Sequence, residues 1–526
     1  MSLSDVPPLI VAAIVGAPLV AALAMGVFAG AGETWTHILN TRLGTYTLTT
    51  LAVLALTGGL ILALAVPLAW LVTMYRFPGR GVFEWLLILP LAAPGYVLAF
   101  AYADTMGVAG PVQSALREAT GWGARDYWFP DIYSAAGLSI VLALALYPYV
   151  YLTARQAFVT TSLCTLDAAR TLGAGPFRAF RSVALPGARP AIVAGLALAL
   201  MEAAADYGAA DFLGIETLTV GVFRAWASHG EAGVAARLAL ILFALALVLR
   251  WLERRQRGEA GSQATSKRWQ TLSRMDLPAP LAWAATGVCA LVFTLGFAAP
   301  VARLVWLAVE TGDTGAGLGE ALRNSLALAA GGAALAFVTG LAIALSARRG
   351  RLGARLAQAA AAGGYAVPGA VLALGGVLVL SQVSVPVSGA AAFVLLLWVY
   401  VARFTAAGAQ PMAAALARAP VSMDQAARAL GAGPVRRLVQ VDLPVALSGA
   451  LVAALFLFVE ILKELPATLM LRPFNWDTLA VRAYGYASDE RLAAAALPCL
   501  MITLAGLGPV IYLSYRLSRA RPGAPE

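Results

Sequence analysis

Long runs without a single charged side chain constrain this fold more than any other feature of the sequence. Asp, Glu, Lys and Arg are absent from residues 6–32, 43–75, 85–103, 132–154, 277–302, 324–347, 356–402 and 492–515. A membrane-spanning helix needs about 20 mostly apolar residues, so each run can form one span and 356–402 can form two. The runs are rich in Ala, Leu, Gly and Val with little alternation, which predicts helices rather than barrel strands.

Placing spans by hydropathy predicts an all-α, polytopic membrane protein with about twelve transmembrane helices. Only 12% of the 526 residues are charged, whereas a soluble chain has about 25%. No basic residue precedes the first apolar run, so we interpret that run as a retained span and not as a cleaved signal. The predicted spans lie near 8–30, 46–75, 82–103, 133–154, 188–212, 232–252, 279–302, 324–347, 357–381, 387–404, 446–469 and 491–515.

The net charge of +10 comes from arginines grouped beside the spans. The positive-inside rule explains this grouping better than binding to nucleic acid does, because no basic face of a soluble domain is present. It predicts a multi-pass protein of the bacterial inner (cytoplasmic) membrane with both termini in the cytoplasm. The loops assigned to the cytoplasm contain basic residues within 76–80, 155–181, 250–257, 348–355, 418–437 and 516–521.

An internal repeat gives the domain organisation. DAARTLGAGPFRAFRSVALP at 167–186 matches QAARALGAGPVRRLVQVDLP at 425–444 with a constant offset of 258. Both copies fall between the fourth and fifth predicted spans of their half. The repeat predicts two parallel six-span halves, 1–252 and 277–526, joined by a charged cytoplasmic linker at 253–276.

Each copy of the repeat has the turn chemistry of two short helices separated by a glycine. Gly173 suits the left-handed position after the first helix, and Pro176 suits the first turn of the second. We expect Leu185-Pro186 to end the second helix before the chain re-enters the membrane. The result is a compact knob whose small residues allow close approach of a partner protein.

The pattern resembles the EAA loop of type I ABC importer permeases, E-A-A-x-x-x-G followed by a hydrophobic-Leu-Pro ending. In that family the loop forms the coupling helix that docks into an ATPase subunit. The resemblance implies coupling loops at 155–187 and 409–445, although the leading Glu of the family is Asp in the first loop and Gln in the second. The matching positions are Asp167, Ala168, Ala169, Gly173, Leu185, Pro186, Gln425, Ala426, Ala427, Gly431, Leu443 and Pro444.

No catalytic residue and no cofactor site is predicted in this chain. Neither of its lysines, Lys267 and Lys463, follows a glycine, so the sequence contains no Walker A motif. The three cysteines and two histidines are scattered and form no metal-binding pattern. The resemblance therefore implies two copies of a separate cytoplasmic ABC ATPase, which bind the ATP and Mg.

Four acidic residues lie in the spans that follow the two loops. At the same offset of 258, Glu202 aligns with Glu460 and Asp206 with Glu464. Acids four residues apart share one face of a helix. A charge at the bilayer centre costs about 3 kcal/mol, so these acids should face the protein interior. Two interpretations stay open: a cation-attracting pathway or gate, and structural pairing with Lys463 or with hydroxyl and backbone groups across the interface of the two halves.

A second resemblance bears on the cargo. KELPATLMLRPF, within residues 459–490, looks like the second-half signature of fused ferric-iron importer permeases, and 205–226 resembles their first-half counterpart. That family implies an alternating-access pathway for ferric iron, with a periplasmic iron-binding protein docking on outer loops 213–231 and 471–489. Carboxylates suit a hard trivalent cation, and they suit protons or polyamines equally well. Permeases for thiamine, phosphonate and polyamine share the architecture and remain alternatives.

Two rival classes fit the sequence less well. A twelve-span secondary transporter needs no ATPase partner and therefore no pair of matched cytoplasmic knobs. A membrane-embedded enzyme needs a nucleophile and base or a metal constellation, and neither a His-Glu metal pattern nor G-x-S-x-G occurs.

Overall fold

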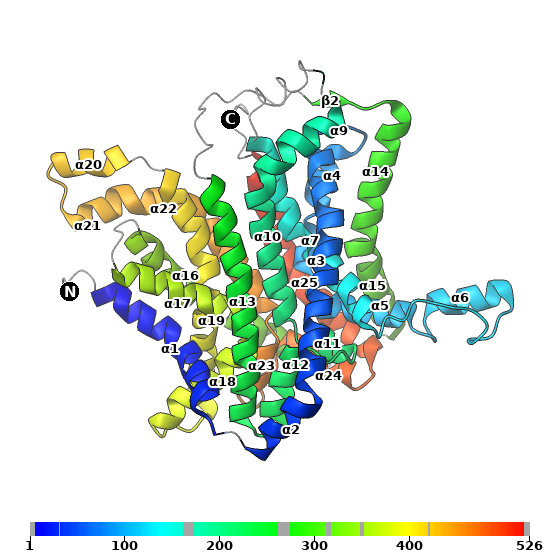
Figure 1. Ribbon diagram of the computed structural model, residues 1–526, viewed down its shortest axis with the longest axis horizontal. Helices are drawn as coiled ribbons and strands as arrows, with labels where there is room; N and C mark the ends of the chain where they lie inside the picture. Colours follow the sequence, from blue (N-terminus) through cyan, green and yellow to red (C-terminus); the bar gives the residue numbers. More distant parts are fainter. Residues whose placement is uncertain are drawn as a thin grey trace. The chain divides into compact units, whose positions relative to one another are not determined.

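A computed structural model describes the chain except for residues 1–5, 31, 161–172, 174, 261–273, 312–316, 348–351, 419–420 and 520–526. Across the described ranges the chain is helical apart from loops and one two-residue strand pair (Figure 1). Nine of the described helices are long and apolar enough to cross a membrane, and three bent helix pairs raise the number to as many as twelve. This confirms the predicted all-α architecture, because a backbone in lipid must satisfy its hydrogen bonds internally.

The chain packs into two compact units. Unit 1 consists of residues 1–43, 218–243 and 314–486. Helices α16 and α22 pack against α19, and α1 packs against α17 and α18. The elements of unit 1 are α1 (Val6–Phe28), α2 (Glu33–Thr41), α12 (Leu218–Phe223), η4 (Arg224–Ser228), α16 (Leu318–Ala347), α17 (Leu352–Ala366), α18 (Gly369–Gln382), α19 (Gly389–Arg418), α20 (Val421–Ala429), α21 (Pro434–Arg437), η6 (Leu438–Asp442), α22 (Leu443–Leu462), α23 (Pro466–Leu471) and α24 (Leu479–Ser488).

Unit 2 consists of residues 44–217, 244–313 and 487–526, and α13 (Ala232–Ala260) passes from one unit into the other. Here α7 packs against α10 and α5, and α25 packs against α15. Its remaining elements are α3 (Leu43–Met74), β1 (Tyr75–Arg76), α4 (Arg80–Leu86), η2 (Leu89–Ala92), α5 (Gly95–Met106), α6 (Pro111–Thr120), α7 (Ala135–Thr160), α9 (Pro176–Ala179), η3 (Phe180–Ala184), α10 (Leu185–Ala205), α11 (Gly208–Phe212), β2 (Met275–Asp276), α14 (Ala279–Phe293), η5 (Thr294–Ala298), α15 (Ala299–Thr311) and α25 (Leu492–Arg519).

The packing groups the helices differently from the sequence repeat. Helix α1, from the beginning of the chain, packs within unit 1 on helices of the second half. Gly375 of α18 lies so close to the backbone of Pro18 in α1 that a Cβ has no space there, which is the small-residue contact typical of membrane helices. Helices α14, α15 and α25 of the second half pack within unit 2. The boundaries predicted at 252 and 277 describe the repeat and stay a prediction.

Two predicted spans are broken by Pro-Gly pairs. The span placed over 82–103 bends by 93° between η2 and α5, and the span over 357–381 bends by 119° between α17 and α18. Pro94 and Pro368 precede the new helices, whose first residues are Gly95 and Gly369. Proline has no backbone N–H for the preceding turn and cannot continue a helix without a kink, so each break follows from local chemistry.

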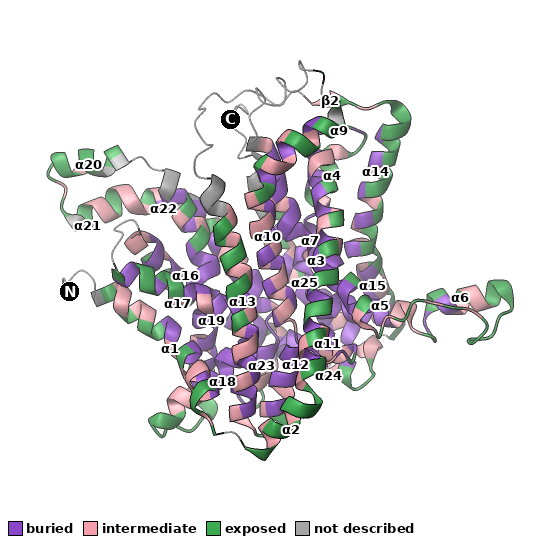
Figure 2. Cartoon of the chain, viewed as in Figure 1, coloured by how far each residue is buried: buried purple, intermediate pink, exposed green. Residues whose placement is uncertain are grey.

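Buried side chains fill the interior of each unit and lie on the inner helix faces (Figure 2). In unit 2 the large side chains of Tyr147, Tyr151 and Phe158 on α7 are fully buried. The parallel pair β1–β2 joins the end of α3 to the chain segment that leads into α14, with Tyr75 opposite Met275. Because β2 ends the predicted linker, this pair fixes the second half's first helix to the end of α3.

Candidate functional site

The second predicted coupling loop forms two short helices around a left-handed glycine. Helix α20 ends before Gly431, which has a φ of 75°. The Gly431 N–H donates to the carbonyl of Arg428, and the Ala432 N–H donates to the carbonyl of Ala427 at 3.0 Å. This is the glycine-terminated helix end that the sequence predicts. Pro434 then begins α21, also as predicted.

The first coupling loop shows the same geometry where it is described. Gly173 has a φ of 83°, and Pro176 begins α9. The predicted positions Asp167, Ala168 and Ala169 lie outside the described residues. In the second loop, Gln425 and Ala426 are exposed and Ala427 is half-buried. Leu185 and Leu443 are half-buried at the start of their spans.

The expected helix stop at each Leu-Pro pair is wrong. Helix α9 continues through the π-helical turn η3 into α10, which begins at Leu185 and contains Pro186. In the second half, η6 leads in the same way into α22 at Leu443-Pro444. A wide π turn re-routes the backbone hydrogen bonds just ahead of the proline, so the missing N–H does not terminate the helix.

Both loops expose apolar side chains at equivalent positions. Phe177 after the first glycine is 74% exposed, and Val435, at the same offset of 258, is 72% exposed. Leu430 beside Gly431 is 84% exposed. Exposed hydrophobic side chains at matched positions of a repeat are typical of a surface that contacts another protein. Sequence reasoning missed these three residues, although apolar positions matched across the repeat would have identified them.

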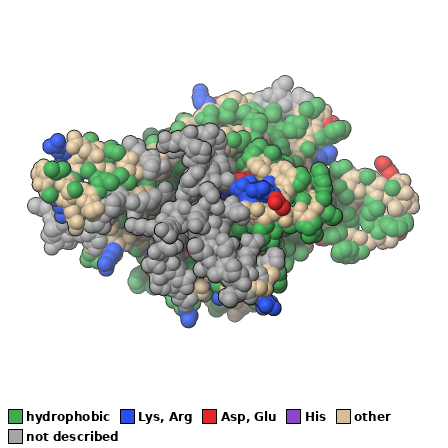
Figure 3. Space-filling model, turned by 90° about the horizontal axis from the view of Figure 1, so that it is seen from above, with side chains coloured by type: hydrophobic (Ala, Val, Ile, Leu, Met, Phe, Trp, Pro, Cys, Tyr) green, Lys and Arg blue, Asp and Glu red, His purple; other side chains and the backbone are tan. Residues whose placement is uncertain are grey.

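Loop glycines leave room at the surface. An added Cβ at Gly173 or Gly431 meets no atom within 4 Å. Substitution there strains only the left-handed backbone and causes no internal clash. Figure 3 views the face where α9 and β2 lie in Figure 1; more basic than acidic side chains are visible on its described part.

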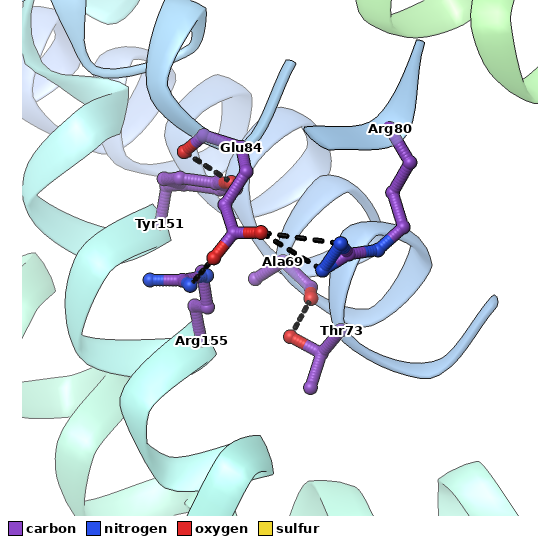
Figure 4. A network of polar contacts seen from close by, with 6 residues as sticks. All are labelled: Ala69, Thr73, Arg80, Glu84, Tyr151 and Arg155. Atoms are coloured by element: carbon purple, nitrogen blue, oxygen red, sulfur yellow. Dashed lines mark hydrogen bonds and ion pairs between the residues drawn. The ribbon is translucent and has the colours of Figure 1, made fainter. Parts of the chain in front are cut away.

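A buried ion cluster holds the base of the first loop in unit 2 (Figure 4). Glu84 of α4 accepts hydrogen bonds from Arg155 and from Arg80, the latter at 2.8 and 3.2 Å. The Tyr151 hydroxyl donates to the backbone carbonyl of Glu84 at 3.3 Å. Arg155 stands near the end of α7, the helix that leads into the loop. The cluster therefore fixes the end of α7 to α4.

This cluster was also missed from the sequence. Glu84 stands just before the charge-free run 85–103, and the sequence places only Arg80, four residues earlier, as a local partner. Its second partner, Arg155, lies on another span, so only the tertiary contact between α4 and α7 shows that pair. Glu84 and Arg155 are both buried, and a buried carboxylate is stable only when it is paired.

The four predicted pathway acids do not lie in pairs on single helix faces. Helix α10 ends at Ala205, before Asp206, and α22 ends at Leu462, before Glu464. Each second acid lies beyond the end of the helix that carries the first, so the prediction of a shared face is wrong. The chain unwinds there because each acid caps a new short helix.

Asp206 and Glu464 act as helix caps inside their units. Asp206 Oδ1 accepts the backbone N–H of Ala209 in α11 at 2.8 Å. Glu464 accepts the backbone N–H groups of Ala467 and Thr468 in α23, both at 3.0 Å. Capping by a carboxylate satisfies N–H groups that have no partner within the helix.

Each cap also packs against the Pro-Gly break of its unit. A Cβ at Gly95 would lie 2.6 Å from Asp206 Oδ2, and a Cβ at Gly369 would overlap Glu464 Oε1. Both glycines are therefore required by close approach of a carboxylate. In this way each cap joins the broken span to the span that follows the coupling loop.

The remaining charged pathway candidates are paired or half-buried. Lys463 contacts Glu460 at 2.8 Å, which is the structural partner considered from the sequence. Glu464 forms a longer pair with Arg403 at 3.9 Å. Glu202 is half-buried on α10. Across the described ranges, no three His, Cys, Asp or Glu side chains are grouped so as to hold a metal ion.

An acid-centred network orders the loop between α23 and α24 in unit 1. Asp477 pairs with Arg472 and, at 3.8 Å, with Arg482. Asn324 donates to the Asp477 carbonyl at 3.2 Å. The loop thus presents Phe474, which is 91% exposed, from a fixed backbone.

The comparisons with known proteins agree with this geometry. The family of binding-protein-dependent transport system inner membrane components matches residues 62–258. The molybdenum transport system permease protein ModB of Escherichia coli is 31% identical over 205 residues, which are 37% of this chain and 86% of that protein. The chain belongs to this family of inner membrane transport components.

One longer relative of this inner membrane component and one solved structure were also found. The Fe(3+)-transport system permease protein FbpB 2 of Haemophilus influenzae is 25% identical over 459 residues, covering 85% of this chain and 84% of that protein. A solved bacterial alginate ABC transporter covers 46% of this chain and 88% of its own, with 12% identity and a TM-score of 0.39.

The family assignment confirms the resemblance inferred from the two loops. This inner membrane component is a multi-pass transport protein and not an enzyme. The family match over 62–258 contains the first coupling loop together with Glu202 and Asp206. The structure adds the internal contacts of these acids, which are absent from the sequence pattern.

Proposed function

We propose that this chain is the permease subunit of an ATP-driven importer and that its two glycine-centred loops receive two copies of a cytoplasmic ABC ATPase. The observation that carries the proposal is the repeated surface: a left-handed glycine in each loop, with exposed Phe177 and Val435 at equivalent positions. ATP and Mg bind to the ATPase. Both loops and both termini face the cytoplasm.

In this proposal, closure of the ATPases moves the two loops and switches an alternating-access pathway. Movement passes from the first loop into α7 and α10. The buried Glu84–Arg155 pair ties α7 to α4, so the broken span moves with the loop. In unit 1, the cap at Glu464 ties the span after the second loop to α18 through Gly369.

The cargo we propose is ferric iron, delivered by a periplasmic iron-binding protein. The relative named as an Fe(3+) permease matches along 85% of the chain, so it shares the two-half organisation. In this proposal the binding protein docks on outer loops 213–231 and 471–489. Phe474 is the most exposed large apolar side chain of these two loops.

An oxyanion is the second candidate cargo, and two observations favour it. The molybdenum permease is 31% identical over 37% of this chain, whereas the Fe(3+) permease is 25% identical over 85% of it. In addition, Asp206 and Glu464 accept backbone N–H groups, and Lys463 pairs with Glu460. Carboxylates used in this way are poor candidates for iron ligands.

Uptake measurements separate the cargoes. Cells without their own iron and molybdate importers express this chain with its ATPase and binding protein, and take up labelled ferric iron or labelled molybdate. Iron uptake that depends on ATP supports the first candidate. Molybdate uptake alone replaces iron with an oxyanion and leaves the permease assignment intact.

The coupling loops are tested by paired glycine variants. Gly173→Val with Gly431→Val places β-branched residues at left-handed positions, at a cost of about 1–2 kcal/mol each or more, without an internal clash. We expect normal insertion and loss of uptake. Gly433→Val is the matched control, because Gly433 is equally open but not left-handed. Normal uptake by the double variant would refute the coupling assignment.

A further inference from the structure

The first half contains a segment that the second half lacks. Residues 107–134 connect α5 to α7, whereas only 383–388 connect α18 to α19 at the equivalent point of the repeat. The longer connection contains α6 and an irregular return segment that leads back to α7. We call residues 107–134 the α6 hairpin. Its presence in one half only separates it from the transport machinery that both halves share.

The α6 hairpin is an ordered element with a polar interior. Gln113 is buried, and its amide donates to the Met106 carbonyl at 2.8 Å. The Tyr127 hydroxyl donates to Gln113 at 2.8 Å and accepts a hydrogen bond from Arg117 at 3.1 Å. Trp122 stacks on Tyr127 with ring centroids 6.0 Å apart. These contacts fix the return segment on the polar face of α6.

The other face of α6 is apolar and lies open. Val112, Ala115, Leu116 and Ala119 follow the i, i+3, i+4, i+7 spacing of one helical stripe. Val112, Ala115 and Ala119 are exposed and Leu116 is half-buried. The stripe is therefore turned away from the hydrogen-bonded return segment.

Further aromatic and aliphatic side chains are exposed elsewhere on the hairpin. Trp128 is 85% exposed, Trp122 is 48% exposed and Val108 is 61% exposed. Tryptophan concentrates at the membrane–water boundary, where its ring contacts lipid and its N–H contacts water. An apolar helical stripe and exposed tryptophans within one short segment are the composition of an interfacial element.

The position of the hairpin in unit 2 fits the membrane boundary. It begins where α5 ends and ends where the membrane span α7 begins. In Figure 1, α6 runs across the direction of α7 and extends sideways from α5 and α15. A helix attached at the end of a span and directed sideways lies along the membrane surface.

We propose that the α6 hairpin is a lipid anchor that lies in the outer interface of the membrane and holds the outer end of α5. Its occupant is the lipid of the outer leaflet, contacted by the stripe of α6 and by Trp128. The hairpin contains two arginines against one glutamate and two aspartates. Binding therefore relies on apolar and aromatic contact and not on attraction to anionic headgroups.

Depth-dependent quenching tests the anchor. The full chain, with Cys164, Cys289 and Cys499 replaced, receives one cysteine at Val112 or Trp128, is labelled with an environment-sensitive fluorophore and is placed in phosphatidylcholine nanodiscs. Spin-labelled lipid with the nitroxide high in the acyl chain should quench both sites about threefold more than a label at Glu118, which lies off the stripe. Adding anionic lipid should leave the difference unchanged.

Three results would overturn the anchor. Equal quenching at Val112 and Glu118 would show that α6 has no lipid face. Strong iodide quenching at Trp128 without lipid quenching would place the hairpin in water. Protection of the label by an added periplasmic binding protein, without lipid quenching, would make the hairpin a protein-docking site. Quenching is measured only on protein that has inserted into the nanodisc. If the variant labelled at Val112 or at Trp128 fails to fold, the other labelled variant still gives the result.

Discussion

Replacing Glu464 with alanine removes one carboxylate that serves three donors. Its Oε1 accepts the Ala467 N–H at 3.0 Å, and its Oε2 accepts the N–H at 3.0 Å and the hydroxyl at 2.8 Å of Thr468. The side chain is buried, so water does not replace it. The Thr468 hydroxyl is also within hydrogen-bond distance of the Glu464 backbone carbonyl, at 2.9 Å, and keeps that acceptor in the variant. Only the two N–H groups therefore lose their acceptor.

The magnitude follows from those two N–H groups. Each buried donor left without an acceptor costs about 1–3 kcal/mol, so Glu464→Ala should lower the free energy of unfolding by about 2–6 kcal/mol. Loss of the 3.9 Å pair with Arg403 adds to this. Glu464→Gln keeps one acceptor oxygen but turns an NH₂ group toward the other N–H. We therefore expect about half the loss for Gln.

The assay is SDS titration of purified protein in mixed micelles, followed by tryptophan fluorescence, alongside cargo uptake in cells. Asp206→Asn should be milder, because an Asn oxygen can still accept the Ala209 N–H. Glu118→Ala, at an exposed position, is the control and should change stability by less than about 0.5 kcal/mol. Wild-type stability of Glu464→Ala combined with lost uptake would refute the capping role and restore the pathway interpretation.

Two further variants test other contacts of unit 2. Glu84→Gln leaves two guanidinium groups around a neutral amide in a buried site, so it should lower the free energy of unfolding by about 3–5 kcal/mol in SDS titration. The same variant should uncouple ATP hydrolysis from transport in proteoliposomes. Gly95→Ala brings a Cβ to 2.6 Å from Asp206 and should cost about 1–3 kcal/mol, whereas Gly59→Ala, which has open space, should cost less than about 1 kcal/mol in the same titration.

Local chemistry explains which parts of the fold were predictable. Spans are recognisable because lipid excludes charge and forces the backbone into helices, so charge-free length alone places them. Gly431 was predicted correctly because a left-handed helix end is a property of one residue and its neighbours. The Leu185-Pro186 stop was predicted wrongly because the sequence does not show that η3 re-routes the hydrogen bonds before the proline.

The roles of the buried charges required the tertiary structure. From the sequence, Glu464 was equally consistent with a pathway and with structural pairing, because Gly369 and Arg403, which contact it, lie far away along the chain. The Glu84–Arg155 pair was invisible for the same reason. Electrostatic energy depends on distance and burial, and neither quantity is encoded in local pattern.

The sequence by itself determined the membrane-spanning helices, the twofold repeat and the glycine-centred loops, since each follows from hydropathy or from the backbone preference of single residues. Only the tertiary structure decided that α1 packs on helices of the second half and that α25 packs within unit 2. Hydropathy identifies each span as apolar but does not distinguish the surface of one span from that of another. Which helices meet is set by shape, such as the contact of Gly375 with the Pro18 backbone, and shape appears only when the helices are packed.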